Sequence, residues 1–374
     1  MRSYYNTITL QTEDLRNLTS VQVERCYDEG KLASLMDVQT FRNLKRVVVT
    51  GCGDSYSAAG AMLSTFRLHS GLSRVDAPDP MDFCRFYSKE EVTCGYDEDQ
   101  VLVIAVSASG GSTRISEILE KANKMGVHSM LISNNPASSG AKMAKHMYYV
   151  ETPEGCNSPG FRSYFASLVA LSALSAYIGL VQEHIGRNRF EEIRDSIQPH
   201  MMAFMEQFDR IDREMIALAQ SWKNYTKFEI IGDHDAAFSA QFVEEKFIEC
   251  AGVHTVHADS EDWCHINFFL REPQTIGTVF MTARDSASFD RVIYSIRSAV
   301  QVGRPVLVVT DAEEGLIPRG AAVCRIPKAK EGWLNALTDF IPGSLLGSYV
   351  AECAGKLFFG GKYDYRTQTW HSDS

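Results

Sequence analysis

A pattern of strands, loops and helices that occurs twice constrains the fold of this 374-residue chain more than any other feature. Three segments of the first half recur in the same order in the second half: 47–61 in 228–242, 103–118 in 278–293, and 126–134 in 303–311. The matched positions lie 181, 175 and 177 residues apart: Gly51 with Gly232, Ser107 with Thr282, and Gly126 with Gly303. Three similar offsets in one order predict two copies of a single domain.

Short apolar runs alternate with helical patterns inside each copy. In the first copy, the sequence predicts strands at 46–50, 101–106, 127–133 and 147–151, helices at 56–69 and 115–125, and a turn at 134–140. Strands separated by helices are typical of parallel βαβ units. The predicted fold class is therefore α/β, with two tandem, doubly wound, parallel flavodoxin-like sheets and flanking helices.

The same patterns divide the chain into five predicted parts. These are an N-terminal helical segment at 1–45, a first domain at 46–185, a charged helical linker at 186–222, a second domain at 223–355, and a C-terminal tail at 356–374. A chain of this length allows each domain to bury a core of its own.

Charge and cysteine content exclude several classes of protein. The formal net charge is −10 and the chain has no run of lysine or arginine, so we expect no nucleic-acid partner. Nine scattered cysteines without a CxxC pair are typical of a reducing compartment, and the N-terminus lacks the pattern of a secretion signal. We therefore expect a cytoplasmic protein without a disulfide framework or a zinc ribbon.

Segment 163–182 is uncharged and long enough to span a bilayer. An apolar helix of this length can also lie in the core of a large domain. The segment carries four serines and stands alone in the chain. We expect a buried core helix rather than a membrane span.

The segment 106–117, VSASGGSTRISE, follows a predicted strand and opens a predicted helix, and a second loop, GCGDS at 51–55, ends another strand. Ligands of such folds bind beyond the carboxyl ends of the strands, where backbone amides at a helix start favour an anion. Glycines let these amides converge, and hydroxyls add donors. The residues predicted to bind a phosphate are Ser55, Ser107, Ser109, Ser112, Gly53 and Gly110.

A purely structural role for the serine loop remains an alternative, because Ser109 or Ser112 could simply cap the helix. The loop is neither a GxGxxG fingerprint nor a P-loop. The corresponding loops of the second copy carry Asp233, Asp235 and Asp285, which would repel a phosphate. We therefore expect one anion site per chain, in the first copy.

The stretches 50–59 and 103–151 resemble the sugar isomerase (SIS) family, whose hallmark is Ser-x-Ser-Gly-x-Thr/Ser at a helix start. Nearly the whole chain resembles a tandem SIS arrangement, as in the isomerase half of glucosamine-6-phosphate synthases and in fructoselysine-6-phosphate deglycases. This resemblance implies that the four serines named above are the phosphate-binding hydroxyls. Ala108 stands where some members have a glutamine that contacts the ligand.

Candidates for acid–base catalysis lie in segment 242–269. Lys246 and Glu249 are three residues apart on a predicted helix, and His265 follows Glu249 by sixteen residues. A carboxylate can move a proton between adjacent sugar carbons, and a histidine can donate and accept near neutral pH. From the residues alone, ordinary positions are the favoured interpretation: a solvated helix residue for Glu249 and loop residues for His254, His257 and His265.

The SIS resemblance implies roles for these residues. Glu249 matches the family's proton-transfer base, His265 its ring-opening group, and Lys246 a lysine near the sugar in the synthase type. In the family the histidine reaches the site of a neighbouring subunit, which implies a homodimer or a higher homo-oligomer.

Three features depart from the synthase pattern. The family usually reads Glu-x-x-His-Gly-Pro, whereas this chain reads DWCHIN at 262–267. The tail has Trp370 near the position of a synthase lysine, with Lys362 well upstream, which is closer in character to the deglycases. No N-terminal cysteine for a glutaminase is present, so we do not expect synthesis of glucosamine-6-phosphate from glutamine.

We therefore expect a phosphosugar-processing enzyme, either a deglycase or deaminase or an aldose–ketose isomerase. Its substrate would be a 6-phosphorylated ketosamine or amino sugar, and the reaction a proton transfer between C1 and C2. No metal or cofactor is expected, because the acid–base pair can do this work. The alternative is a non-catalytic regulator that binds a sugar phosphate. A nicotinamide-dependent dehydrogenase is disfavoured because the glycine fingerprint is missing.

Overall fold

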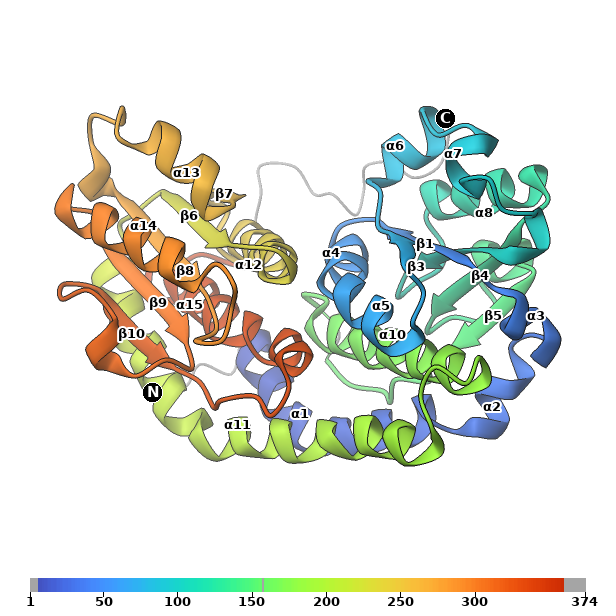
Figure 1. Cartoon of the computed structure of the whole chain (residues 1–374). Helices are drawn as coiled ribbons and strands as arrows, with labels where there is room; N and C mark the ends of the chain where they lie inside the picture. The colour runs from blue at the N-terminus through green and yellow to red at the C-terminus, as the bar shows by residue number, and fades with distance from the viewer. Residues whose placement is uncertain (1–5, 157, 360–374) are drawn as a thin grey trace. The chain divides into compact units, whose positions relative to one another are not determined.

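Two five-stranded sheets, in which neighbouring strands pair in parallel, form the framework of the computed structural model (Figure 1). The structure describes residues 6–156 and 158–359. The sheet orders are β2-β1-β3-β4-β5 and β10-β9-β8-β6-β7. When the strands are numbered within each copy, both orders become 2-1-3-4-5, as in flavodoxin-like folds. The predicted fold class is confirmed.

The strands of the two copies are short and largely apolar. The first sheet consists of β1 (Arg46–Gly51), β2 (Arg74–Asp76), β3 (Val101–Val106), β4 (His128–Ser133) and β5 (His146–Tyr149). The second consists of β6 (Lys227–Gly232), β7 (His254–Ala258), β8 (Ile276–Met281), β9 (Val306–Thr310) and β10 (Ala322–Arg325). Every residue of β1, β3 and β8 is buried, as expected for central strands covered on both faces.

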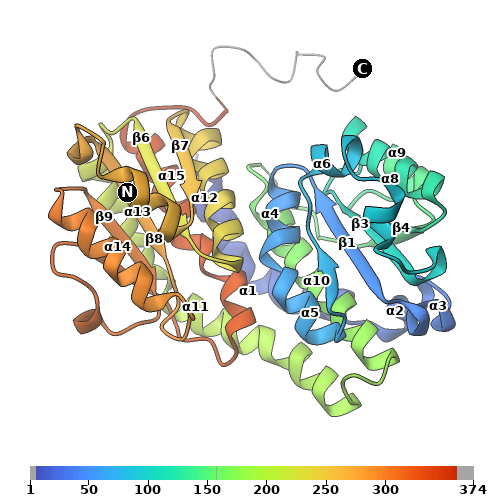
Figure 2. The same ribbon diagram turned by 45° about the horizontal axis from the view of Figure 1, so that its top comes forward.

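Helices cover both faces of the first sheet (Figure 2). One face carries α6 (Pro80–Arg85), α7 (Lys89–Thr93) and α8 (Thr113–Met125), which share a core cluster with β1, β3 and β4. The other carries α4 (Asp54–Ala61), α5 (Leu63–Ser70) and α10 (Phe161–Val181). Shorter helices precede the sheet or connect its strands: α2 (Glu29–Ser34), α3 (Val38–Asn43), η1 (Glu98–Gln100) and α9 (Ser139–Met143).

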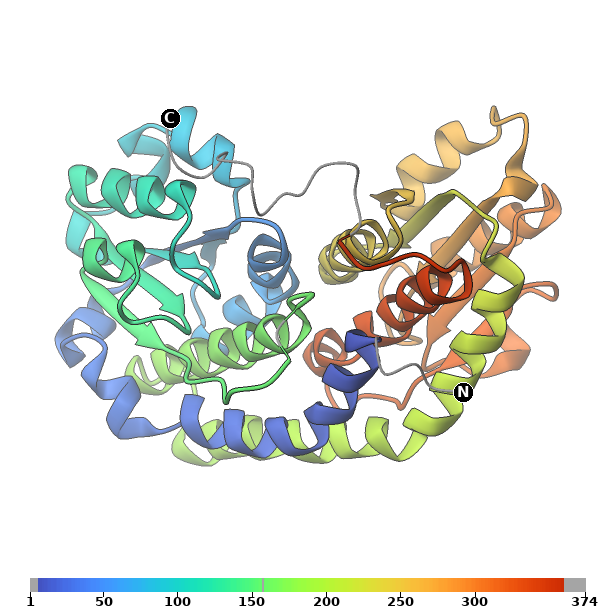
Figure 3. The same cartoon turned by 180° about the vertical axis from the view of Figure 1, so that it is seen from behind.

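The second sheet is covered in the same manner. On one face, α13 (Ser260–Asn267) and α14 (Phe289–Gln301) share a core with β6, β8 and β9, and the ring of Trp263 packs edge-on against Phe280. On the other face lie α12 (Asp235–Ala251) and α15 (Phe340–Cys353), which Figure 3 shows side by side in yellow and red. The remaining short helices are η2 (Pro273–Thr275), η3 (Glu314–Leu316) and η4 (Gly332–Leu337).

The chain forms two compact units, each with one sheet. Among the described residues, one unit comprises 6–16 and 199–359, and the other comprises 17–198. The division falls inside two helices, α1 (Thr7–Cys26) and α11 (Arg187–Trp222). The five predicted parts of the chain remain a prediction. The tail residues Lys362 and Trp370 lie outside the described residues.

The uncharged segment forms α10, whose side chains are almost all buried within the first-sheet unit. Within residues 6–156 and 158–359, α10 is the one helix long and apolar enough to cross a membrane. A core position accounts for its composition, because a helix enclosed on all sides needs no polar face. The prediction of a buried helix is confirmed.

The predicted strands 46–50, 101–106, 127–133 and 147–151, and the predicted helix 115–125, all exist, with ends within two residues of those expected. The predicted helix at 56–69 is instead two helices, α4 and α5. Met62, with φ −101° and ψ 7°, leaves helical geometry between them. Of the predicted N-terminal helical segment, the described residues 6–45 contain α1, α2 and α3.

Candidate functional site

The two serine-containing loops follow β1 and β3, the neighbouring strands at which the order of the first sheet reverses direction. Gly51 at the end of β1 pairs with Val106 at the end of β3, so the loops leave the sheet side by side. The crevice beyond the strands at such a switch point is where doubly wound folds bind their ligands.

The serine loop is shaped by its own hydroxyls. The Ser107 Oγ accepts a hydrogen bond from the Gly110 N–H at 3.0 Å, and the Ser109 Oγ accepts one from the Gly111 N–H at 3.4 Å. Gly110 has a φ of +63°, and a Cβ at this position would lie 2.3 Å from the Ser138 Oγ. Only glycine fits this turn.

Ser112 is the N-cap of α8, where its Oγ accepts a hydrogen bond from the Ile115 N–H at 3.3 Å. The capping alternative is therefore right for this serine. Its hydroxyl also lies at the positive end of the helix, beside the amides that favour an anion. Phosphate binding by Ser112 remains a prediction.

The loop GCGDS brings the start of α4 close to the sheet. A Cβ on Gly51 would lie 2.8 Å from both the Val106 carbonyl oxygen and the Ser55 carbonyl carbon. Gly53 has a φ of +55° and precedes the first turn of α4, which contains Ser55. Burial raises the pKa of the Cys52 thiol to about 11, so this side chain is neutral near pH 7.

A third loop, after β4, supports the serine loop. The carbonyl of Ala108 accepts hydrogen bonds from the Ser133 hydroxyl and the Asn134 N–H, both at 3.1 Å. The Gly140 N–H donates to the Gly110 carbonyl at 3.0 Å. The sequence predicted only a turn here, because this support depends on β4 lying next to β3.

The matching loops of the second copy line a cavity of about 420 Å³. Its carboxylates are Asp233, Asp235, Asp285, Asp311 and Asp339. Asp233 accepts hydrogen bonds from the N–H and the hydroxyl of Ser260, at 2.7 and 2.8 Å. Burial raises the pKa of Asp339 to about 7. The three aspartates singled out in the sequence thus face one cavity, where a phosphate would meet negative charge.

Lys246 and Glu249 lie together on α12. The Lys246 side chain is wholly buried (0% exposed), and its Nζ donates to the Glu249 Oε2 at 2.5 Å. The ammonium also lies 4.7 Å from the centre of the Phe242 ring. The Glu249 side chain is 34% exposed, so the lysine of this pair is enclosed by protein while the carboxylate is partly accessible to solvent.

His265 lies on α13 with 70% of its side chain exposed, and its Nε2 is 3.0 Å from the Glu261 Oε1. Because α12 and α13 cover opposite faces of the second sheet, this unit does not bring His265 to Lys246 and Glu249. Action of His265 at the site of another subunit remains a prediction.

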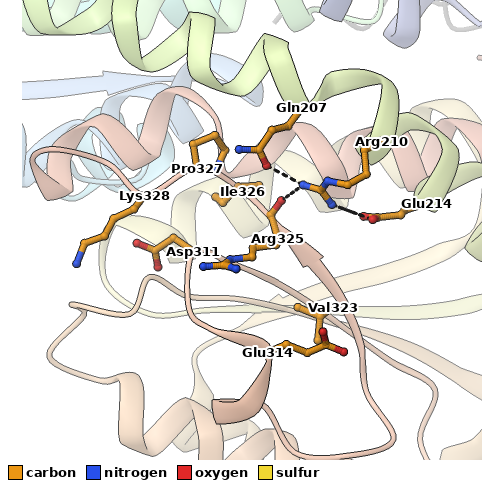
Figure 4. Close-up of a pocket in the computed structure, with 10 residues that line it drawn as sticks. All are labelled: Gln207, Arg210, Glu214, Asp311, Glu314, Val323, Arg325, Ile326, Pro327 and Lys328. Carbon is orange, nitrogen blue, oxygen red and sulfur yellow. Dashed lines mark hydrogen bonds and ion pairs between the residues drawn. The ribbon is translucent and has the colours of Figure 1, made fainter.

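Figure 4 shows a further cavity, of about 650 Å³, between α11 and β10. Its charged residues are Arg210, Arg325 and Lys328 against Glu214, Asp311 and Glu314. Arg210 is tied to Glu214 at 2.8 Å and to the Gln207 side chain at 2.8 Å. With cations and carboxylates in balance, this cavity lacks the positive excess that would favour a phosphate. Across the described part of the chain, no group of three or more His, Cys, Asp or Glu side chains is placed to hold a metal.

These features define a class: a tandem, parallel α/β protein with two small-residue loops at the switch point of its first sheet. Residues 83–178 match the family model described as the SIS domain. The chain therefore contains an SIS domain, and the resemblance to the SIS family predicted from the sequence is confirmed.

Known proteins resemble the chain over most of its length. The isomerizing glutamine–fructose-6-phosphate aminotransferase of Thermococcus kodakarensis is 22% identical over 84% of this chain and 50% of its own. The chain thus spans about half the length of this relative. Among solved structures, the C-terminal domain of the Francisella tularensis glucosamine–fructose-6-phosphate aminotransferase superposes with a TM-score of 0.79, at 16% identity over 93% of this chain and 96% of that one. Tagatose-6-phosphate ketose/aldose isomerase from Escherichia coli superposes with a TM-score of 0.71, at 12% identity over 98% and 99%.

Proposed function

We propose that this chain is an enzyme that acts on a 6-phosphorylated ketosamine or amino sugar by proton transfer between C1 and C2. The observation that carries the proposal is the ion pair between Glu249 and the wholly buried Lys246. The pair holds the Glu249 carboxylate in one orientation with 34% of its side chain exposed, which suits a general base that must reach a bound substrate. The similar proteins described above, which are named for fructose-6-phosphate and tagatose-6-phosphate, support the substrate class.

The phosphate is held by the two loops of the first sheet. Their hydroxyls and the backbone amides at the starts of α4 and α8 supply the donors, while the Gly110 and Gly111 amides hold the serine loop in shape. The hydroxyls are those of Ser55, Ser107, Ser109 and Ser112. This arrangement needs no arginine, which suits a chain of net charge −10.

The chemistry falls to the residues of the second copy. His265 accepts the proton of the anomeric hydroxyl and gives one to the ring oxygen, which opens the sugar; Glu249 then takes a proton from one carbon and returns it to the next. Lys246 lies near the sugar and fixes the Glu249 carboxylate. After this shift the sugar nitrogen is held as an imine; addition of water breaks the C–N bond, leaves a sugar carbonyl and releases the amine, which makes the enzyme a deglycase or deaminase. Retention of the amine makes it an isomerase.

The exposed position of His265 fits work at the site of a second copy of the chain, so the active form is a homodimer or a larger homo-oligomer. Apolar side chains that follow it are also exposed and would be covered by such a partner: Ile266, Phe268, Phe269 and Leu270. Analytical ultracentrifugation measures this directly, and a monomer at micromolar concentration would contradict it.

Mass spectrometry after incubation with several 6-phosphofructosyl amino acids, fructose-6-phosphate and glucosamine-6-phosphate tests the function. Conversion of at least one compound, with loss of the amine or isomerisation, is the expected result. Tight binding of a hexose phosphate without conversion of any compound would instead favour the regulator.

A further inference from the structure

Arg304, in the connection between α14 and β9, is a buried arginine whose guanidinium contacts three elements of the second-sheet unit. Its side chain is wholly buried (0% exposed). The Nη1 group donates to the Glu229 Oε2 on β6 at 2.7 Å and to the Thr278 Oγ1 on β8 at 3.0 Å. The Nη2 group donates to the Asn267 Oδ1 at the end of α13. One side chain thus joins two strands to the helix that carries His265.

The helix completes a closed cycle of hydrogen bonds around this arginine. The Trp263 Nε1 donates to the same Glu229 Oε2 at 2.6 Å, and the Asn267 Nδ2 donates to the Trp263 carbonyl at 2.8 Å. The guanidinium carbon also lies 5.1 Å from the centre of the Trp263 ring, within range of a cation–π contact. Trp263 and Asn267 are therefore both held by the pair of Arg304 and Glu229.

His265 lies midway between these two anchors. Residues 263 and 267 are four apart on a helix and share the face turned toward the sheet, whereas residue 265 points away from it. The exposures agree, with Trp263 buried and His265 outward. The Glu261 carboxylate, 2.5 Å from the Arg291 Nε of α14, lies beside the His265 ring. The backbone of His265 is thus fixed on both sides, while its ring remains 70% exposed beside the Glu261 carboxylate.

We propose that Arg304 is a positioning residue for His265, acting through Glu229, Trp263 and Asn267. This inference rests on the proposed function, in which His265 opens the sugar ring. A buried ionic network is often no more stabilising than a well-packed apolar replacement, so stability alone does not account for it. The network fixes the orientation of α13 and therefore of His265. Small displacements of a reacting group lower the rate of a reaction by large factors.

The variant Arg304→Lys keeps the charge but loses the planar fork that joins Glu229 to Asn267. We expect kcat to fall at least about tenfold with KM unchanged, because the phosphate-binding serines are untouched. Arg319→Lys, at an exposed loop position, is the matched control and should leave kcat unchanged. Trp263→Phe, which keeps the ring but loses the N–H donor, is the second variant if Arg304→Lys does not fold.

Two measurements separate positioning from a merely structural effect. In a His265→Asn background, Arg304→Lys should cause no further loss of kcat, because the residue through which it acts is gone. The imidazole NMR signals of His265, assigned from their loss in His265→Asn, should shift or broaden in Arg304→Lys and stay unchanged in Arg319→Lys. Additive losses of kcat, or unchanged imidazole signals in a folded Arg304→Lys protein, would overturn the proposal. If the wild-type chain converts no phosphosugar, the proposed function fails, and the NMR comparison alone decides whether Arg304 orients His265.

Discussion

Ser109 and Ser112 of the serine loop are both proposed to bind the phosphate, and one of them also caps a helix. Substitutions can separate these two roles. Ser112 caps α8, whereas Ser109 is exposed at the tip of the loop. Ser109→Ala should weaken binding of glucosamine-6-phosphate about tenfold, the value of one hydrogen bond to a charged group. The hydrogen bond that Ser109 accepts within the loop, from the Gly111 N–H, is long, at 3.4 Å, so the change in stability should be smaller than that from losing the helix cap. Ser112→Ala should in addition lower the free energy of unfolding by about 1 kcal/mol. Isothermal titration calorimetry and urea unfolding measure the two effects.

The control for this pair is Ser286→Ala, in the matching loop of the second copy, which should leave binding unchanged. An equal loss of affinity in Ser286→Ala and Ser109→Ala would contradict an anion site confined to the first copy.

Asp339 gives the molecule a pH dependence of stability. Burial raises its pKa to about 7, and the nearby Asp235 adds to the rise. In the unfolded chain this carboxyl ionises near pH 4, so the folded state loses about 1.4 kcal/mol of stability per pH unit between about 4 and 7. The substitution Asp339→Asn removes this loss, and should therefore stabilise the protein more at pH 8 than at pH 4. Urea unfolding at both pH values tests this, and an equal effect at both would contradict it.

At the scale of elements, the packing of α10 against α5 depends on a glycine. A Cβ on Gly179 would lie 2.0 Å from the His69 carbonyl oxygen. Alanine favours a helix interior by about 1 kcal/mol over glycine, but here the clash dominates. We expect Gly179→Ala to lower the free energy of unfolding by about 2 kcal/mol or more in urea titrations. Gly186→Ala, where a Cβ meets no atom within 4 Å, is the control, and an equal change in both variants would contradict the packing argument.

The strands were the elements easiest to predict from the sequence, because their signal is local. Val101–Val106 is an uninterrupted apolar run that ends where serines and glycines begin, and β3 has these bounds. The break between α4 and α5 at Met62 was missed, because no proline or cap residue marks it. The support of the serine loop by Ser133 was also missed, because it depends on which strands are neighbours in the sheet.

Only part of the candidate site could be predicted, because local sequence patterns do not report contacts made by tertiary packing. The position of the serine loops follows from their places after two predicted strands. Burial of Lys246 was not foreseeable, since a lysine on a helix is ordinarily exposed, and only packing beside Phe242 shows otherwise. The anchoring of α13 through Glu229 and Arg304 joins residues 75 positions apart, which no local pattern reports.

At the scale of the whole molecule, the two copies share a topology but differ in charge at their switch points. The loops of the first present serines, glycines and one aspartate, Asp54, whereas the second presents five aspartates around one cavity. Calorimetric titration with a hexose phosphate should therefore give one bound ligand per chain. A stoichiometry of two would contradict the difference between the copies.

The central claim is that Glu249 transfers a proton on a phosphosugar. The most direct test uses a phosphosugar that the wild-type chain converts. The wild type and the Glu249→Gln variant are incubated with it in D₂O, and deuterium at the sugar carbons is followed by NMR. The account predicts deuterium incorporation by the wild type and a rate at least about 100-fold lower in Glu249→Gln, with sugar-phosphate binding retained. Incorporation by Glu249→Gln at the wild-type rate would contradict it.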